Sequence, residues 1–98
     1  MIYKNPNCRR VRGSHIIIIS CGYCKTDIAE YKKAGKGRLL RMYVDRIIRS
    51  SIDLSKNQEA IFCPNCKEQL ATKVTLNVKN IDAYIMIRGV FNTREANR

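Results

Sequence analysis

Three observations predict a small, mainly β fold for this sequence. The chain has 98 residues, enough for one domain with a modest core, and without tryptophan that core must be mainly aliphatic. Short runs of β-branched residues alternate with turn-forming residues, as is typical of strands joined by loops. Two C-x-x-C motifs, at residues 21–24 and 63–66, have the spacing of metal ligands. The sequence therefore predicts a metal-stabilised β fold.

Three stretches outside the motifs predict strands. Residues 15–20 form a β-branched run that leads into the first cysteine pair. Residues 74–78 alternate between apolar and polar side chains, and a turn is expected directly after them at residues 79–80. Residues 83–91 form a third β-rich run, in which Gly89 marks a bulge or a bend.

The segment at residues 31–51 allows two interpretations. On a helical wheel, most apolar side chains from Leu39 to Ile48 occupy one half and the arginines occupy the other, which indicates an amphipathic helix. Gly35 and Gly37 at the start of the segment argue against a helix, and its β-branched and aromatic residues favour a strand. We expect a strand, with one short amphipathic helix within residues 38–51 as the alternative. The polar stretch at 50–59 predicts a loop.

The two ends of the sequence differ from its middle. Residues 1–14 combine four basic side chains with Asn, Pro and Gly, which predicts an extended or mobile basic N-terminal arm. Residues 15–91 are expected to form the metal-binding β domain, and residues 92–98 a polar tail.

The apolar run at 16–19 is far too short for a signal peptide or a membrane span. We therefore expect a cytoplasmic protein with no membrane span and with reduced thiols. The odd number of cysteines also favours reduced thiols over a set of disulfides.

The two cysteine motifs belong to a longer repeated unit. In residues 18–25 and 60–67 a hydrophobic strand ends at a C-x-x-C, and a lysine follows. An apolar residue returns three or four positions later, at Ile28 and Leu70. Such a repeat indicates two half-sites of one construction.

One zinc ion per chain is the predicted cofactor, with Cys21, Cys24, Cys63 and Cys66 as its ligands. Two cysteines on one tight turn can face the same ion, and two such turns complete a tetrahedral site. Gly22 suits a sharp turn because it permits unusual backbone angles, and Pro64 suits one because it fixes φ.

The tetrapeptides Cys21-Gly22-Tyr23-Cys24 and Cys63-Pro64-Asn65-Cys66 resemble the zinc-ribbon, or double zinc-knuckle, superfamily. This resemblance implies a largely β fold around one structural zinc, and roles in transcription, translation or protein contacts. Both motifs depart from the common pattern, because a lysine follows the second cysteine where glycine is usual. The motifs are also similar to those of rubredoxin, which keeps an iron-containing electron carrier as a remote alternative.

Residues for catalysis are scarce, so we expect a non-enzymatic protein. A single histidine, His15, and eight carboxylates without paired spacing offer little acid–base chemistry. A closed site of four cysteines has no open position for activating water. The fifth cysteine, Cys8, has basic neighbours that could make its thiol reactive, but an unpaired thiol on a flexible arm is the simpler interpretation.

The charge indicates an anionic partner, either nucleic acid or a membrane surface. The formal net charge is +11, and residues 1–49 contain twelve basic and three acidic side chains. Interleaved tyrosines could stack on bases beside phosphate contacts, so RNA or DNA is the expected partner. The candidate contacts are Lys32, Lys33, Lys36, Arg38, Arg41, Tyr43, Arg46 and Arg49. Alternatively these tyrosines belong to the core or to strands, and the charges form a solvated face. The second functional candidate is a metal-stabilised protein-interaction module in which segment 31–51 contacts another protein.

Overall fold

The computed structural model describes residues 1–56, 58–76 and 81–96. Its elements in chain order are β1 (Tyr3–Lys4), β2 (Ser14–Cys21), β3 (Asp27–Ala34), β4 (Arg41–Tyr43), η1 (Val44–Arg46), β5 (Ile47–Ser50), η2 (Leu54–Lys56), β6 (Ala60–Phe62), β7 (Gln69–Leu76), β8 (Ile81–Met86) and β9 (Phe91–Glu95). Here η denotes a 3-10 helix. Within the described residues there is no α-helix, and the mainly β prediction is confirmed.

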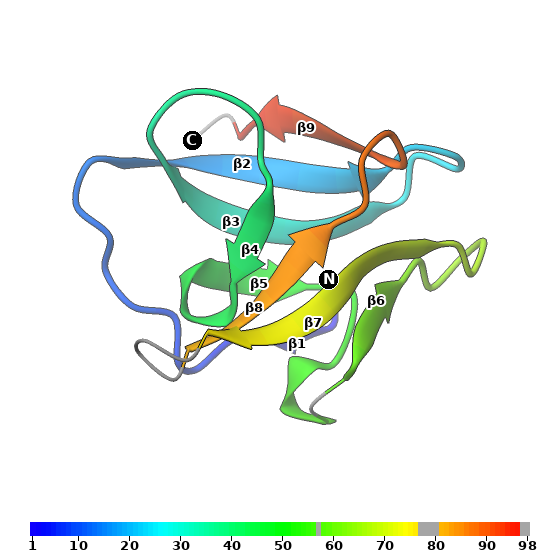
Figure 1. Cartoon of the computed structure of the whole chain (residues 1–98), viewed down its shortest axis with the longest axis horizontal. Coiled ribbons are helices and arrows are strands. Elements are labelled where there is room, and N and C mark those ends of the chain that lie inside the picture. The colour runs from blue at the N-terminus through cyan, green and yellow to red at the C-terminus, as the bar shows by residue number, and fades with distance from the viewer. Residues whose placement is uncertain (57, 77–80, 97–98) are drawn as a thin grey trace.

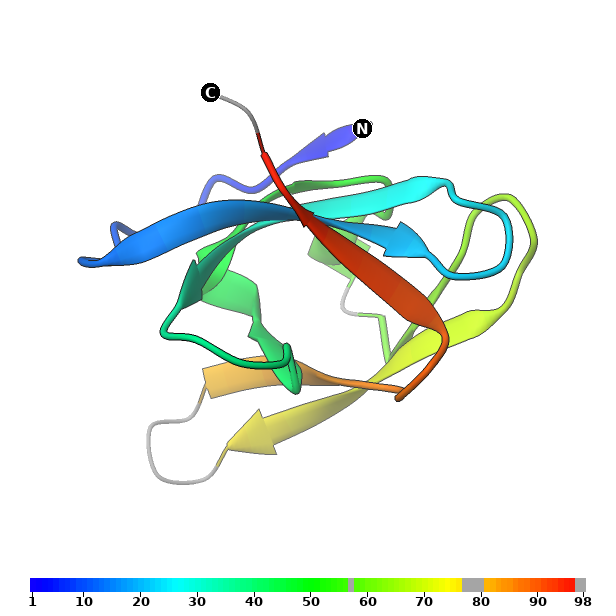
Figure 2. The ribbon, with the colours of Figure 1, turned by 90° about the horizontal axis from the view of Figure 1, so that it is seen from above.

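The strands form two antiparallel sheets that lie over one another (Figure 1, Figure 2). The first sheet has the strand order β1-β5-β3-β2-β9, and the second has the order β4-β8-β7-β6. Strands β9 and β4 are therefore edges of different sheets. The chain passes from one sheet to the other in the loop between β3 and β4, at η1, between β5 and β6, and at the turn after β8.

Alternating side chains of β2 help to build the core between the sheets. Ile17, Ile19 and Cys21 are at most 4% exposed, as the period of two in a strand requires for residues on one face. From the second sheet, Met42 and Tyr84 are buried to a similar degree and belong to the same hydrophobic cluster. Burial of each large apolar side chain contributes about 1.5–3 kcal/mol relative to an exposed one.

Each cysteine motif forms the turn of a hairpin. The first hairpin is β2–β3 and belongs to the first sheet, and the second hairpin is β6–β7 and belongs to the second sheet. Both views show the two turns side by side at one end of the molecule (Figure 1, Figure 2). The cysteines therefore meet where the two sheets meet.

The predicted strand at 83–91 and the predicted tail at 92–98 both need correction. The chain forms two strands there, β8 in the second sheet and β9 in the first, and Gly89 with φ of 85° lies in the turn between them. Strand β9 pairs with β2 through Glu95, so most of the expected tail is a sheet edge. Pattern alone does not show this, because an edge strand needs no apolar outer face. The expected turn at 79–80 and the last two residues of the expected strand 74–78 lie outside the described residues, as do residues 97–98.

The ambiguous segment at 38–51 forms strands separated by a single 3-10 turn. Strand β4 pairs with β8 in the second sheet, whereas β5 pairs with β3 in the first. Met42 and Ile47 are both fully buried, one on each side of the crossing at η1. The apparent helical periodicity therefore arises from two strands of different sheets, and the short helix kept as an alternative is not present.

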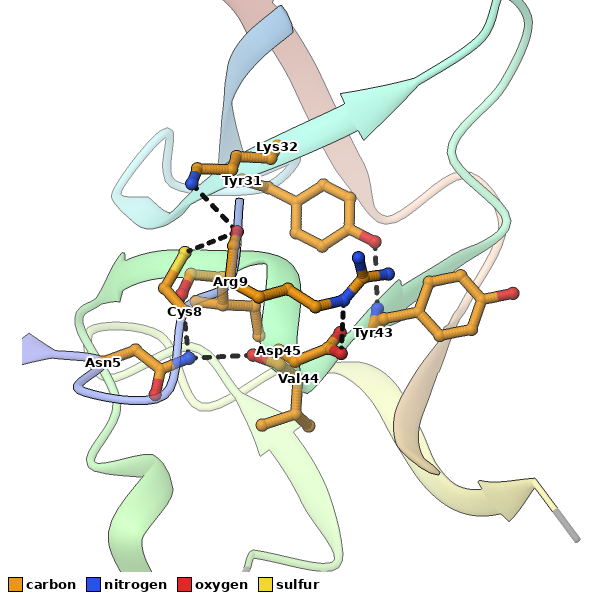
Figure 3. Close-up of polar contacts among 9 residues, drawn as sticks. Asn5, Cys8, Arg9, Tyr31, Lys32, Tyr43, Val44 and Asp45 are labelled. Carbon is orange, nitrogen blue, oxygen red and sulfur yellow. Dashed lines mark hydrogen bonds and ion pairs between the residues drawn. The ribbon is translucent and has the colours of Figure 1, made fainter. Parts of the chain in front are cut away.

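Residues 1–14, the predicted basic N-terminal arm, are in contact with the first sheet (Figure 3). Strand β1 pairs with β5. The side-chain amide of the buried Asn5 donates to the carbonyl oxygen of Val44 at 2.8 Å. The guanidinium of Arg9 pairs with the Asp45 carboxylate at 2.7 Å. Polar contacts hold the segment, so an apolar pattern could not have revealed them.

Candidate metal centre

The four predicted cysteines are brought together in one cluster. Their Sγ atoms all lie within 4.8 Å of one another. The Sγ atoms of Cys21 and Cys66 lie 3.5 Å apart, as do those of Cys24 and Cys63. Each short pair joins one hairpin to the other, so the cluster links the two sheets.

The two hairpins repeat the same backbone hydrogen bonds. In the first, the amide of Lys25 donates to the carbonyl oxygen of Cys21 at 3.0 Å, and that of Cys21 donates to Thr26. In the second, Lys67 donates to Cys63 at 3.0 Å, and Cys63 donates to Glu68.

Three further features of the two hairpins correspond. Both have a register shift directly before the first cysteine, at Ile19/Ser20 and at Ile61/Phe62. The first cysteine of each motif is fully buried and the second is half-buried. The apolar residue that follows each motif, Ile28 or Leu70, is at most 1% exposed. The sequence repeat thus corresponds to a structural repeat.

The lysines that replace the usual glycines adopt the left-handed backbone region. Lys25 has φ of 66° and Lys67 has φ of 69°. This conformation costs a side-chain-bearing residue roughly 1–2 kcal/mol relative to the right-handed region. Each ammonium group donates to the carbonyl oxygen of the residue after the first cysteine, Gly22 at 3.2 Å or Pro64 at 2.8 Å. The turn geometry is therefore retained without glycine.

Hydrogen bonds and burial shift the pKa values of Cys24 and Cys66 in opposite directions. The Asn65 side chain and the hydroxyl and amide of Thr26 donate to Cys24, and they lower the pKa of that thiol to about 5. At Cys66 the amide of Glu68 lowers the pKa, but desolvation and the three neighbouring cysteine side chains outweigh it and raise the pKa to about 12. One thiolate is therefore well supported, and a second must overcome repulsion from the first. A bound cation removes this obstacle.

The donor set fits a tetrahedral metal ion. Four thiolates at a Zn–S distance of about 2.3 Å place their sulfurs about 3.8 Å apart, within the range that the cluster spans. Four soft sulfur donors in this arrangement suit zinc or iron, and they do not suit magnesium or calcium. The cluster can therefore hold one such ion between the hairpins.

The turn of the first hairpin also rests on the chain between β8 and β9. The amide of Gly22 donates to the carbonyl oxygen of Val90 at 2.8 Å. A Cβ at position 22 would lie 2.8 Å from that same carbonyl group, so the backbones approach too closely for any side chain. The close approach, and not the backbone conformation, requires glycine at this position, since the φ of Gly22 is not positive.

Two further candidate residues lie outside the cluster. His15 belongs to β2, and its Nε2 atom lies 3.3 Å from the Glu95 carboxylate of β9. Cys8 is half-buried in the N-terminal segment, beside a cavity lined by Lys4, Lys32 and Arg49. Neither residue is within reach of the four sulfurs as a ligand.

The eight predicted nucleic-acid contacts do not form a single face. Lys33, Lys36 and Arg38 lie together, on the end of β3 and the loop that follows it, and line one cavity. Lys32 and Arg49 line a different cavity, under the N-terminal segment. The remaining three, Arg41, Tyr43 and Arg46, belong to β4 and η1.

Some of these candidates already have intramolecular partners. Arg49 pairs with the buried Glu30 at 3.5 Å, and the ammonium of Lys32 donates to the carbonyl oxygen of Arg9 (Figure 3). The guanidinium of Arg46 lies 4.7 Å from the centre of the Tyr43 ring, which occupies one face of that ring. By contrast, no carboxylate in the described part of the chain forms an ion pair with Lys36, Arg38 or Arg41.

Sequence reasoning did not identify Arg88, Phe91, Thr26 or Asn65. Arg88 lies in the turn between β8 and β9, Phe91 begins β9, and both line a cavity with Arg38. Their positions depend on the chain changing sheets there, for which the sequence gives no local signal. Asn65 lies within the second motif and Thr26 two residues after the first, so both residues, which bond to Cys24, could have been found by position alone.

No protein-family model, curated protein or solved structure matches this chain. Within the described residues, no helix is long and apolar enough to cross a membrane.

Proposed function

We propose that this is a non-catalytic zinc-binding protein of the zinc-ribbon type that binds nucleic acid, either RNA or DNA. The four-cysteine cluster supports the metal part of this proposal. The ion would join the two hairpins and with them the two sheets, as structural zinc does in small domains. All four corners of a tetrahedral site would be occupied by sulfur, which leaves no position for a reacting water.

The grouping of Lys33, Lys36 and Arg38 carries the nucleic-acid part. These cations lie on one short stretch, and the two that follow β3 are exposed. Phosphate binding needs cations that are not neutralised by nearby carboxylates, and Lys36 and Arg38 meet this condition within the described residues. The excess of positive charge in residues 1–49 would attract a polyanion over a longer range.

Salt-dependent binding tests this proposal. A surface that uses four to six basic groups gives a log–log slope of affinity against salt of about −3 to −5, because each neutralised phosphate releases counterions. Replacing Arg38 and Arg41 by glutamine together should flatten this slope by about 1.4 to 1.8 and leave the metal content unchanged. Lys56→Gln removes one exposed charge from η2 and serves as the control. Absence of binding to RNA and DNA at low salt would refute the proposal.

A protein-interaction module is the second candidate, because large apolar side chains are exposed on the second sheet. Phe62 is 51% exposed and Ile85 is 46% exposed. A module of this kind would bind a discrete protein partner with little dependence on salt. Replacing Ile85 by threonine, which keeps the β-branched shape, should then lower the affinity for that protein partner and leave nucleic-acid binding unchanged.

A further inference from the structure

We propose that a groove between β9 and the loop joining β3 to β4 binds single-stranded nucleic acid, with an unpaired base against Phe91 and phosphates beside Lys36, Arg38 and Arg88. This inference rests on the proposed function and assigns its site and its substrate class. Arg88 and Phe91 lie outside the segment from which nucleic-acid binding was first inferred.

Two adjoining cavities form the groove. The larger, of about 740 Å³, is lined by Arg38, Leu40, Met86, Arg88 and Phe91 among others. The smaller, of about 350 Å³, is lined by residues that include Lys33 and Lys36. Both are also lined by Arg38, Leu39 and Thr93, so they are continuous.

The groove follows the opening between the two sheets. Strand β9 is the edge of the first sheet, and β4, which begins directly after the loop, is an edge of the second. Phe91, Thr93 and Glu95 pair in register with the buried Cys21, Ile19 and Ile17. They therefore lie on the inner face of the first sheet, at the point where no further strand covers it.

The lining combines an apolar floor with a cationic rim. Leu39 and Met86 are at most 7% exposed, and Phe91 is half-buried above them. Arg38 and Arg88 are exposed, on the loop and on the turn after β8 respectively, and no carboxylate in the described part of the chain forms an ion pair with either. An aromatic ring flanked by cations is the arrangement by which proteins stack a base and neutralise its phosphates.

This geometry favours a single strand over a duplex. A base must leave its stack before its face can reach Phe91, because bases in a duplex are covered by their neighbours. Strand β9 has five residues and spans about 13 Å, so the groove accommodates a short extended stretch of backbone. A rigid duplex would meet only the rim cations.

Glu95 places a negative charge in the smaller cavity of the groove. Its side chain is 69% exposed and lies beside His15 in the cavity that Lys33, Lys36 and Arg38 also line, whereas Arg88 lines only the larger cavity. A phosphate is repelled by Glu95 and attracted by the arginines. Removing the negative charge of Glu95 should therefore strengthen binding, a change opposite in sign to the loss of any rim cation.

Fluorescence anisotropy with matched single-stranded and duplex oligonucleotides of RNA and DNA tests this inference. The single strand should bind more tightly than the duplex of the same sequence. Phe91→Leu keeps an apolar side chain in the floor but removes the ring, and should weaken single-strand binding by about 5- to 150-fold. Arg88→Gln should flatten the salt slope by about 0.7. Glu95→Gln should raise the affinity, and Lys56→Gln should behave as the unaltered protein apart from a small general charge effect.

The outcomes separate this inference from the proposed function. Equal binding of duplex and single strand, with no effect of Phe91→Leu or Arg88→Gln, would overturn the groove and leave nucleic-acid binding in place. Absence of binding to any oligonucleotide at low salt would overturn both, as would binding of an extended acidic peptide alone. Metal content and thermal melting verify that Phe91→Leu is folded. Should it unfold, Arg88→Gln and Glu95→Gln still decide the question, because both positions are exposed.

Discussion

The two hairpins that supply the cysteines have the same local structure but different surroundings. Both place a lysine in the left-handed region and a buried cysteine first. The first hairpin is held at Gly22 by the chain between β8 and β9, whereas Pro64, at the corresponding position of the second, is exposed. One short sequence unit therefore fixes the ligand geometry twice, and its remaining positions adapt to their neighbours.

This comparison explains why glycine and proline exchange at corresponding positions. Gly22 donates its amide hydrogen to Val90 and leaves no room for a Cβ. Proline could not replace it, because proline has no amide hydrogen and carries a ring. Pro64 has no such demand to meet, and its fixed φ restricts the unfolded chain instead.

Removing any one sulfur of the cluster should have the largest effect, and the same effect in both hairpins. Cys24→Ser and Cys66→Ser each leave an incomplete site that joins the sheets poorly. Structural zinc contributes about 10–16 kcal/mol in comparable sites, which exceeds the net stability of a typical small domain. Both variants should therefore be unfolded or aggregated by circular dichroism. Cys8→Ser is the matched control and should melt as the unaltered protein does. A folded Cys66→Ser variant beside an unfolded Cys24→Ser variant would show that the hairpins are not equivalent.

The next largest effect, a loss of stability on substitution of the residue after the first cysteine, should differ between the two hairpins. Gly22→Ala forces the backbone near Val90 to move, and overpacking of this kind costs about 1–3 kcal/mol. Pro64→Ala should cost only about 0.4–1 kcal/mol, through the greater freedom of the unfolded chain. Denaturant unfolding of the two metal-loaded variants measures both values. Equal losses would mean that the contact with Val90 contributes nothing to stability.

Replacing the lysine that follows each motif should have a smaller effect on stability, and the same effect in both hairpins. Lys25→Gly and Lys67→Gly remove the strain of the left-handed conformation, which is offset in part by the greater flexibility of glycine. Each should raise the free energy of unfolding by up to about 1 kcal/mol. Destabilisation by either variant would instead assign the main role to the bond from its ammonium group to the turn carbonyl.

The smallest expected effect depends on pH and concerns only the first hairpin. Hydrogen bonds from Arg94 hold the pKa of Asp27 below its usual value, and this pair links the start of β3 to β9. The corresponding residue of the second hairpin is the uncharged Gln69. A carboxyl group with a depressed pKa stabilises the fold above its unfolded pKa, and this contribution is lost as the pH falls through the folded value.

Asp27→Asn should therefore lower stability slightly at neutral pH and have less effect in acid. The pair is largely exposed, so the difference should be small. Melting of metal-loaded protein across the acidic range, beside the Gln69→Glu control, measures it. An equal effect of Asp27→Asn at all pH values would show that the ion pair with Arg94 is not its cause.

Features determined by neighbouring residues could be predicted from the sequence. The C-x-x-C spacing and the strand before each motif depend on a few adjacent positions, so the cysteine cluster and the mainly β fold were accessible. The burial of Ile28 and Leu70 follows from the same local repeat.

Features that depend on distant contacts could not be predicted in this way. The docking of the N-terminal segment depends on Asn5, which bonds to a carbonyl oxygen thirty-nine residues away in sequence. The passage between sheets at Gly89 divides one apparent strand into two. The groove requires both features of β9, its position at the edge and its inward-facing Phe91, and neither leaves a local pattern.

The identity and coordination of the bound metal test the link between the two hairpins most directly. Elemental analysis of protein purified from ordinary medium, with X-ray absorption at the metal edge, should give one zinc per chain surrounded by four sulfurs at about 2.3 Å. A red protein with iron in place of zinc would favour the rubredoxin-like alternative. Protein that contains neither metal, with all four thiols freely titratable and the fold intact, would contradict a metal-joined pair of hairpins.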